Sequence, residues 1–213
     1  MRSKSQNLTR VWDLPTRVFH WTLVVMFALA FLTGDDDHWA LFHITAGYTI
    51  ASLLVFRLIW GYAGTRHARF SDFVKPPREI MQYLRELVGG TTQACAGHNP
   101  AGGVSILLLL LSGSLAVLSG VLISEDVDWP ILEEIHEGAS NFMLLIVALH
   151  ILGVGVSSLL HQENLVEAMI TGLKAQPGGT KPVATHRKLG IALGLAVITF
   201  WIWSFKEKLL SLF

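Results

Sequence analysis

The sequence predicts an all-α fold, a transmembrane four-helix bundle core with a fifth, C-terminal membrane helix. Composition is the first reason: of 213 residues, 52% are hydrophobic and only 15% are charged, and the mean hydropathy is +0.49. Soluble domains carry about 25% charged residues. The second reason is that apolar stretches near the ~20 residues needed to cross a bilayer recur along the chain. The single cysteine, Cys95, excludes an intrachain disulfide and a two-cysteine metal site.

Five apolar stretches are the predicted membrane helices, at residues 18–34, 40–60, 101–123, 131–160 and 189–205. The fourth is long for one crossing, which indicates a tilted helix or one that extends beyond the bilayer. The fifth is the shortest. The basic N-terminal tail precedes the first stretch without a small-residue cleavage site, so we interpret that stretch as a retained membrane helix.

Lysine and arginine alternate between the connections and predict the orientation. The tail up to residue 17 has four, the connection 61–100 has five and the connection 161–188 has four, whereas 35–39 and 124–130 have none. We therefore expect a multi-pass protein of the bacterial inner (plasma) membrane, with its N-terminus in the cytoplasm. The two short acidic connections are expected in the periplasm.

Three details refine this organisation. Residues 78–88 (REIMQYLRELV) place apolar side chains at helical spacing, which fits either an interfacial helix or an ordinary surface helix. Asn99 is the predicted cap of the third membrane helix, and Pro100 its first residue. Lys206 and Lys208 follow the fifth stretch and weigh mildly against its outward crossing.

The nine histidines fall into groups. Four are expected to be solvated or at the membrane interface: His38, His67, His98 and His186. Four others lie within the apolar stretches: His20, His43, His136 and His150. An ionisable side chain at membrane depth is costly and marks a functional site. The alternative for any one of them is a neutral histidine bonded to a neighbouring helix, but four together favour ligands.

Depth and helical facing pair these four histidines. His20 and His150 are expected near the cytoplasmic side, and His43 and His136 near the periplasmic side. The fourteen residues from His136 to His150 make about four turns, so both share one face about 21 Å apart. This suits two flat cofactors, each with its iron between two imidazoles, which carry electrons and leave no open position. His161 competes with His150, but would separate the sites by ~37 Å, more than the ~30 Å hydrocarbon core.

Two arginines near the predicted cytoplasmic side, Arg17 and Arg57, are candidates to bind the propionates of a haem. Their alternative role is snorkelling to lipid headgroups. Small residues near the histidines are expected to allow close packing around a flat ligand. These are Ala46, Gly47, Gly138, Ala139, Ser140 and Gly153.

Several motifs together resemble one family. They are VWDLPTRVFHW (11–21), H-x-x-x-G-Y (43–48), GHNPAGG (97–103), IHE and LH in the fourth stretch, and SSLLHQENLVEAMITGLK (157–174). In this order they resemble the bacterial di-haem cytochrome b family (cytochrome b561 type), which includes the cytochrome b subunits of nickel–iron hydrogenases. The resemblance covers about residues 11–175, which we take as the membrane domain. Residues 186–213 are an additional C-terminal helix and tail.

The resemblance implies two non-covalent b haems in a four-helix membrane core. Its ligand positions map onto His20 and His150 for the cytoplasmic-side iron, and onto His43 and His136 for the periplasmic-side iron. It also implies electron transfer between the quinone pool and a redox partner, either a hydrogenase or a periplasmic c-type cytochrome. Whether the chain acts as a quinone oxidoreductase stays open.

Partners and competing functions follow from the remaining residues. His161, Glu163 and Asn164 are weak candidates for a quinone site. The outer connections and the start of the fourth helix are acidic, either because of topology alone or to dock a basic c-type cytochrome. These acids are Asp35, Asp36, Asp37, Glu125, Asp126, Asp128, Glu133, Glu134 and Glu137.

The alternative function is a histidine-lined metal-ion or proton transporter. Such a protein would need carboxylates at depth and broken helices, which the sequence lacks. A structural membrane anchor is a third hypothesis, but an anchor would not need histidines at matched depths. Membrane lipid is the expected surroundings and no nucleic acid is expected. The oligomeric state stays open, with a homodimer as one option.

Overall fold

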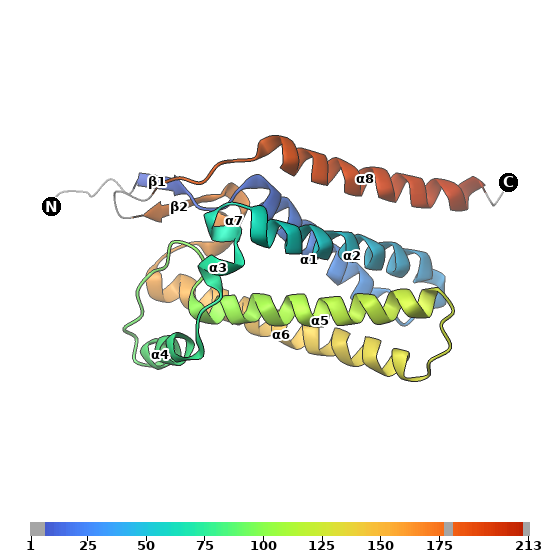
Figure 1. Ribbon diagram of the computed structural model, residues 1–213, viewed down its shortest axis with the longest axis horizontal. Helices are drawn as coiled ribbons and strands as arrows, with labels where there is room; N and C mark the ends of the chain where they lie inside the picture. The colour runs from blue at the N-terminus through green and yellow to red at the C-terminus, as the bar shows by residue number, and fades with distance from the viewer. Residues whose placement is uncertain (1–6, 177–180, 211–213) are drawn as a thin grey trace. The chain divides into compact units, whose positions relative to one another are not determined.

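The computed structural model describes residues 7–176 and 181–210 (Figure 1). The chain divides into two compact units. Unit 1 comprises residues 1–13, 58–110 and 143–185, and unit 2 comprises 14–57, 111–142 and 186–213. Each unit is described by itself. Arg2 and Lys4 of the basic tail and the last three residues of the predicted C-terminal segment lie outside the described residues.

Within the described residues, five helices are long and apolar enough to cross a membrane. They are α1 (Leu14–Leu32), α2 (Ala40–Ala63), α5 (Pro100–Ser124), α6 (Ile131–His161) and α8 (Arg187–Leu210). The predicted all-α membrane fold is therefore confirmed. The main boundary difference is that α1 begins before the predicted residue 18, because Pro15 fits a first helical turn that apolarity alone does not reveal.

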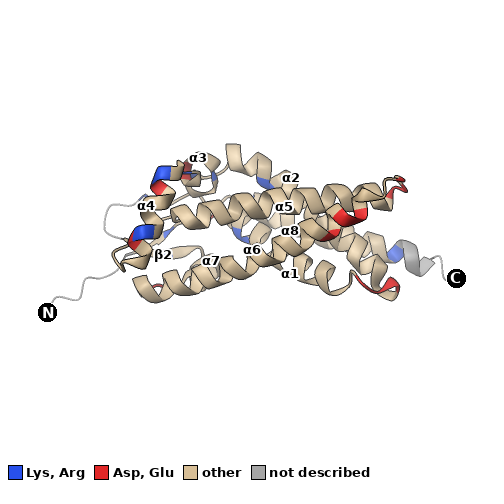
Figure 2. Cartoon of the chain, turned by 90° about the horizontal axis from the view of Figure 1, so that it is seen from below, with Lys and Arg blue, Asp and Glu red and all other residues tan. Residues whose placement is uncertain are grey.

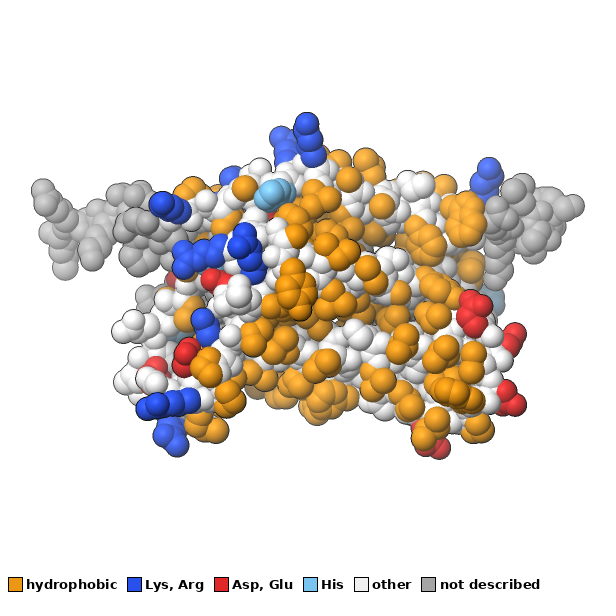
Figure 3. Space-filling model, in the orientation of Figure 1, with side chains coloured by type: hydrophobic (Ala, Val, Ile, Leu, Met, Phe, Trp, Pro, Cys, Tyr) orange, Lys and Arg blue, Asp and Glu red, His pale blue; other side chains and the backbone are white. Residues whose placement is uncertain are grey.

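The surface of each unit is strongly apolar. Leucine, isoleucine, valine and aromatic side chains are exposed along the long helices, for example Leu118 at 63% in unit 2 and Leu159 at 81% in unit 1. Figure 3 shows such side chains over much of the visible face. Because helices that are apolar all round belong in a core or a bilayer, this exposure fits helices surrounded by lipid.

Unit 1 contains the short elements that connect the long helices. Strand β1 (Asn7–Arg10) pairs antiparallel with β2 (Leu173–Gln176), with Leu8 opposite Ala175. The connection after α2 holds η2 (Arg66–Ala68), α3 (Phe70–Phe73) and α4 (Pro77–Val88), and α7 (Leu165–Thr171) precedes β2. The helix predicted over 78–88 is thus confirmed as α4.

The VWDLP motif is fixed within unit 1 by polar contacts. The backbone N–H groups of Val11 and Trp12 both donate to the Gly172 carbonyl, at 2.9 and 3.2 Å. The carboxylate of Asp13 is only 1% exposed and accepts hydrogen bonds from Trp60 Nε1 and Thr65 Oγ1. A buried carboxylate needs such donors, so the motif joins the start of the chain to the end of α2.

His67 and His98 were both expected to be solvated or at the membrane interface. This is wrong for His67, which is buried, whereas His98 is half-buried. His67 is 4% exposed, and its Nδ1 lies 2.9 Å from Asp72 Oδ2. His98 is half-buried, with its ring 4.6 Å from Trp12 and 5.1 Å from Phe73, measured between ring centroids. Their aromatic neighbours come from distant parts of the sequence. His38 and His186 are exposed, as predicted.

The start of α5 confirms the predicted cap. The side-chain oxygen of Asn99 accepts the N–H of Gly102 at 2.7 Å, and Pro100 is the first helical residue. Gly103 then lies against α3, where a Cβ atom would come within 2.4 Å of the Phe73 carbonyl oxygen. Gly102 and Gly103 of GHNPAGG therefore take part in capping and in close backbone approach, respectively.

Unit 2 contains α1, α8, the 3-10 turn η1 (Asp37–Trp39) and parts of α2, α5 and α6. α8 packs along α1, and Gly190 lies against the side chain of Leu14, where a Cβ would be 2.6 Å from Cγ. Trp201 on α8 donates its indole N–H to Thr49 Oγ1 on α2 at 3.0 Å. These contacts make α8 part of this unit. The predicted division of the chain at residue 186 stays a prediction.

We expect Gly103→Ala to destabilise the protein, because the new methyl group meets a backbone carbonyl that cannot rotate away. Overpacking of this kind costs about 1–3 kcal/mol. Thermal unfolding of the purified protein in detergent measures the effect. Gly155→Ala is the matched control, since a Cβ there meets nothing within 4 Å. Equal unfolding temperatures for the two variants would contradict the described contact.

Candidate functional site

Two of the predicted ligands meet in unit 2. His43 comes from α2 and His136 from α6, and their ring centroids lie 5.8 Å apart with an angle of 69° between the planes. Both residues are half-buried. Two imidazoles from different helices thus face each other across a short gap, as the sequence analysis predicted for the periplasmic-side site.

The hydrogen bonds of His43 and His136 determine the tautomer of each ring. His43 Nδ1 lies 2.8 Å from the Ala30 carbonyl oxygen, and His136 Nδ1 lies 2.8 Å from that of Ala116. A carbonyl only accepts, so each Nδ1 carries the proton and donates it. In the neutral imidazole Nε2 then keeps its lone pair, which is the form that binds metals.

Two glycines make room for these rings, and the sequence analysis did not identify them. A Cβ at Gly120 would lie 2.8 Å from His136 Cε1, and one at Gly34 would lie 3.4 Å from His43 Cε1. Each glycine lies four residues after the carbonyl that the ring contacts. A repeated sequence pattern could have pointed to these glycines: residues 29–34 read LAFLTG and residues 115–120 read LAVLSG.

The geometry fits an iron porphyrin bound between the two rings. Metal–imidazole bonds are about 2.0–2.1 Å in zinc sites, so two such ligands on one ion separate their ring centroids by about 6 Å. The observed separation is 5.8 Å. Gly47, one turn after His43, is half-buried and has no atom within 4 Å of the position of a Cβ. The donor set and the space beside it both suit a flat, mostly apolar group.

The other predicted ligands are distributed between the units. His20 is half-buried on α1 in unit 2, with its ring 5.0 Å from that of Trp21, and His150 is half-buried on α6 in unit 1. Their pairing stays a prediction. Arg57 is only 4% exposed, so its side chain does not reach the surface as snorkelling requires. Arg17 is half-buried.

The six small residues that were predicted to surround a flat ligand differ in their burial. Ala46 and Ala139 are buried, and Gly47 and Ser140 are half-buried. Gly138 and Gly153 are exposed, with nothing within 4 Å of a Cβ position. That these two glycines pack around a ligand stays a prediction, because the open space at their Cβ positions is measured without a bound group.

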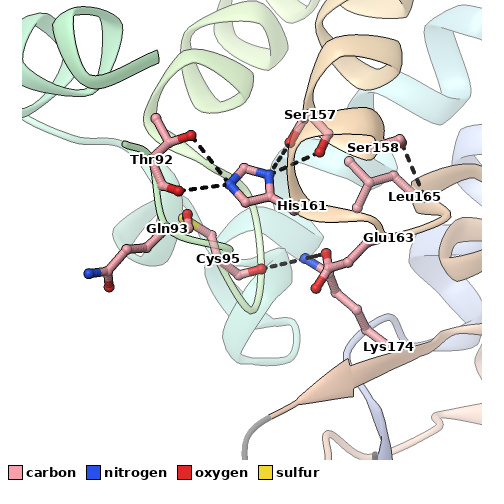
Figure 4. Close-up of polar contacts among 9 residues, drawn as sticks. All are labelled: Thr92, Gln93, Cys95, Ser157, Ser158, His161, Glu163, Leu165 and Lys174. Atoms are coloured by element: carbon pink, nitrogen blue, oxygen red, sulfur yellow. Dashed lines mark hydrogen bonds and ion pairs between the residues drawn. The ribbon is translucent and has the colours of Figure 1, made fainter. Parts of the chain in front are cut away.

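His161 belongs to a polar cluster in unit 1 (Figure 4). Its Nδ1 lies 2.9 Å from the Ser157 carbonyl and therefore donates, while its Nε2 lies 3.3 Å from Thr92 Oγ1 and accepts. Both nitrogens of the ring are engaged with the protein, which leaves none for a metal. This supports the choice of His150 over His161 as a predicted ligand.

The cavity beside His161 is too small for a quinone. It measures about 30 Å³ and is lined by residues that include His161 and Glu163. Ligand pockets usually measure about 300–1,000 Å³. The side-chain oxygen of Asn164 accepts the Glu167 N–H at 2.9 Å and so caps α7. In this structure His161 and Glu163 line a small polar cavity and Asn164 caps α7, and their part in a quinone site stays a prediction.

An ion pair closes the same cluster. Lys174 Nζ lies 2.8 Å from Glu163 Oε2, and it also donates to the Cys95 carbonyl (Figure 4). The side chains are 6% and 18% exposed. Burial raises the pKa of the Cys95 thiol, and the Lys174 charge partly offsets this. Burial likewise raises the pKa of Tyr83, whose hydroxyl bonds to Ser157 and Asn99. Lys174 thus joins β2 both to Glu163, after α6, and to the loop before α5.

Comparisons with known proteins find one matching family model and two curated relatives. The family model described as "Prokaryotic cytochrome b561" matches residues 11–172. Two curated relatives, from Escherichia coli strain K12 and E. coli O157:H7, are each named "Probable Ni/Fe-hydrogenase 1 B-type cytochrome subunit". Each is 25% identical, over 56% of this chain and 63% of the relative, so the chain spans less than two thirds of their length. No solved structure matches.

We expect Lys174→Ala to lower the free energy of unfolding by about 3 kcal/mol, because it leaves a largely buried carboxylate at Glu163 without its cation. The double variant Lys174→Met/Glu163→Leu should recover most of this loss, since it removes both charges. Unfolding in detergent measures both, with the exposed Lys188→Ala as control. A single variant as stable as the control would contradict a structural role for the pair.

Proposed function

The chain belongs to the prokaryotic cytochrome b561 family, and on this basis we propose that it is a di-haem cytochrome that carries electrons across the membrane between the quinone pool and a periplasmic redox partner. As a member of this family with five apolar helices, the chain is a multi-pass membrane b-type cytochrome that binds haem b. The number of haems, the ligands and the partners belong to the proposal.

The pair His43 and His136 carries the proposal. These two imidazoles would hold a haem iron, and that group would supply one-electron chemistry without an open position for oxygen. The protein supplies two neutral imidazoles, each fixed by a carbonyl 2.8 Å from Nδ1. Rings held in this way need little rearrangement when the charge on the iron changes.

The second haem is proposed between His20 and His150. The continuous helix α6 carries both His136 and His150, so one helix offers a ligand to each site. The regular helical rise separates these ligands by ~21 Å along the axis. Arg17 and Arg57 are proposed to bind propionates. Arg57 is only 4% exposed in unit 2, so it places a positive charge inside the protein, where a propionate would be attracted.

The proposed location is a bacterial inner membrane, with the N-terminus in the cytoplasm. The charges of the connections support it. Basic side chains lie on η2, on either side of α3 and on α4, and the connections after α1 and α5 are acidic (Figure 2). We propose residues 11–175 as the cytochrome domain and 186–213 as an added helix and tail.

The redox partner is proposed to dock on the acidic connections of unit 2. All nine carboxylates of these connections and of the start of α6 are exposed: Asp35, Asp36, Asp37, Glu125, Asp126, Asp128, Glu133, Glu134 and Glu137. Their charge suits a basic c-type cytochrome. The names of the curated relatives point instead to a hydrogenase. Both remain within the proposal, with quinone as the other substrate.

The alternative of a metal-ion transporter has less support. Within the residues that the structure describes, no group of three or more His, Cys, Asp or Glu side chains could hold a metal ion. His43 and His136 instead form a pair, which is the number of protein ligands that a six-coordinate haem iron takes.

We expect purified protein to contain two b haems per chain by pyridine haemochrome. His43→Ala and His136→Ala should each lose the same haem, because they hold one iron. His20→Ala and His150→Ala should each lose the other haem. The exposed His38→Ala is the control and should retain both. Full haem content in His43→Ala and in His136→Ala would contradict the proposed site.

We expect reversal of the charges at Asp35, Asp36 and Asp37 to lysine to slow electron transfer to a basic c-type cytochrome by about tenfold at low salt. The normal fall in rate with added salt should also disappear, because the attraction it screens is gone. Stopped-flow reduction at several ionic strengths measures this. Glu79→Lys on α4 is the control for a charge change elsewhere. An unchanged salt dependence would exclude these acids as the docking surface.

A further inference from the structure

Two segments of unit 2 share a sequence pattern and hold the two histidines in the same way. Residues 29–34 read LAFLTG and residues 115–120 read LAVLSG, so each is Leu-Ala-x-Leu followed by a hydroxyl residue and glycine. The first runs across the end of α1, and the second lies within α5. We propose that each segment is a cradle for one axial imidazole of the haem, with Gly34 and Gly120 as positioning residues and the hydroxyl side chain as a modulator of the haem potential.

The alanine carbonyl is the first part of each cradle. Ala30 and Ala116 occupy the same place in the pattern, and each carbonyl oxygen lies 2.8 Å from the Nδ1 of its histidine. The two histidines come from α2 and α6, which are not part of the repeated segments. The same contact therefore arises twice, from two pairs of helices, at the same position of the pattern.

The glycine is the second part. Helical residues four apart lie above one another, so the glycine lies directly beside the carbonyl that the imidazole approaches. A Cβ at Gly120 would lie 2.8 Å from Cε1 and 2.9 Å from Nδ1 of His136. At Gly34 the corresponding distances to His43 are 3.4 and 3.5 Å. The ring at Gly120 is thus held more tightly than the ring at Gly34.

The hydroxyl side chain is the third part, and it competes for the same carbonyl. Ser119 Oγ lies 2.8 Å from the Leu115 carbonyl and 3.0 Å from that of Ala116. Thr33 Oγ1 lies 2.7 Å from the Leu29 carbonyl and 3.4 Å from that of Ala30. The Ser119 hydroxyl therefore lies within hydrogen-bond distance of the Ala116 carbonyl that also accepts from His136. The Thr33 hydroxyl instead donates chiefly to the Leu29 carbonyl, next to the Ala30 carbonyl that accepts from His43.

This competition has a chemical consequence. A strong hydrogen bond from Nδ1 makes an imidazole a more basic ligand, and a more basic ligand stabilises the oxidised iron and lowers its reduction potential. A hydroxyl that donates to the same carbonyl weakens that hydrogen bond. Removing the Ser119 hydroxyl should therefore strengthen the bond from His136 and lower the midpoint potential of this haem.

The proposal rests on the proposed haem site between His43 and His136. An ordinary packing role is the competing explanation, since glycines also let helices approach. The two differ in their spectroscopic signature. A packing role changes stability, whereas a cradle role changes the haem held by this pair and leaves other features of the protein intact.

The first experiment compares three alanine variants in purified protein. Gly120→Ala should lose the haem of this pair or change its low-spin electron paramagnetic resonance signal. Gly34→Ala should retain the haem with a smaller change, because its Cβ has more room. Gly155→Ala, on α6 and exposed with nothing within 4 Å of a Cβ, is the matched control. A Gly120→Ala protein identical to this control in haem content and spectrum would overturn the proposal.

The second experiment does not depend on tolerance of a larger side chain. Ser119→Ala should keep both haems, and redox titration should give a lower midpoint potential for one of them. Ser52→Ala is the control, because its hydroxyl donates only to the Tyr48 carbonyl, away from the histidines. An unchanged or raised midpoint in Ser119→Ala would overturn the modulating role. If the Gly120→Ala protein cannot be produced in folded form, the midpoint potential of Ser119→Ala decides the proposal by itself.

The histidine variants distinguish a failure of the proposed haem site from a failure of the cradle alone. If His43→Ala and His136→Ala retain both haems, the proposed site itself fails. If they lose one haem while Gly120→Ala and Ser119→Ala leave it unchanged, the site stands and only the cradle fails.

Discussion

Each imidazole near membrane depth must satisfy its own N–H, and the rest of the candidate site depends on this constraint. No water is available in hydrocarbon, and an unsatisfied polar group costs several kcal/mol there. In unit 2 the acceptors are helix carbonyls, 2.8 Å from each ring. The residue four positions after each carbonyl is a glycine, Gly34 or Gly120, and the missing Cβ leaves room for the ring.

The same need for partners organises unit 1, where the polar groups come from connections instead of membrane helices. Asp13 is buried and takes its donors from Trp60 and Thr65, and Lys174 joins Glu163 to the carbonyl of Cys95. Buried charges are stable only when paired and hydrogen-bonded. Because each partner lies far away in sequence, these contacts hold the beginning of the chain, the connection 61–100 and the segment after α6 in one compact unit.

The sequence predicted those features that depend on local pattern. Long apolar runs gave the membrane helices, and Asn99 before Pro100 gave a helix start, because span length and capping are properties of neighbouring residues. Depth and facing also predicted that His43 and His136 form a pair; their ring centroids lie 5.8 Å apart, and their role as ligands stays a prediction. The burial of His67 was missed because its neighbours, Trp12 and Asp72, are brought to it by the fold. Gly34 and Gly120 were missed because the fold, and not a local pattern, brings the imidazoles to them.

The two imidazoles of the pair have unequal environments, and the reason lies in the helix that supplies each carbonyl. Ala30 is within the last turn of α1, where carbonyls lack regular helical partners, and the Thr33 N–H reaches it only at 3.3 Å. Ala116 lies inside α5, where its carbonyl also serves the helical N–H four residues later and the Ser119 hydroxyl. The carbonyl facing His43 is therefore the less occupied acceptor. We infer that His43 forms the stronger Nδ1 hydrogen bond and is the more basic of the two ligands.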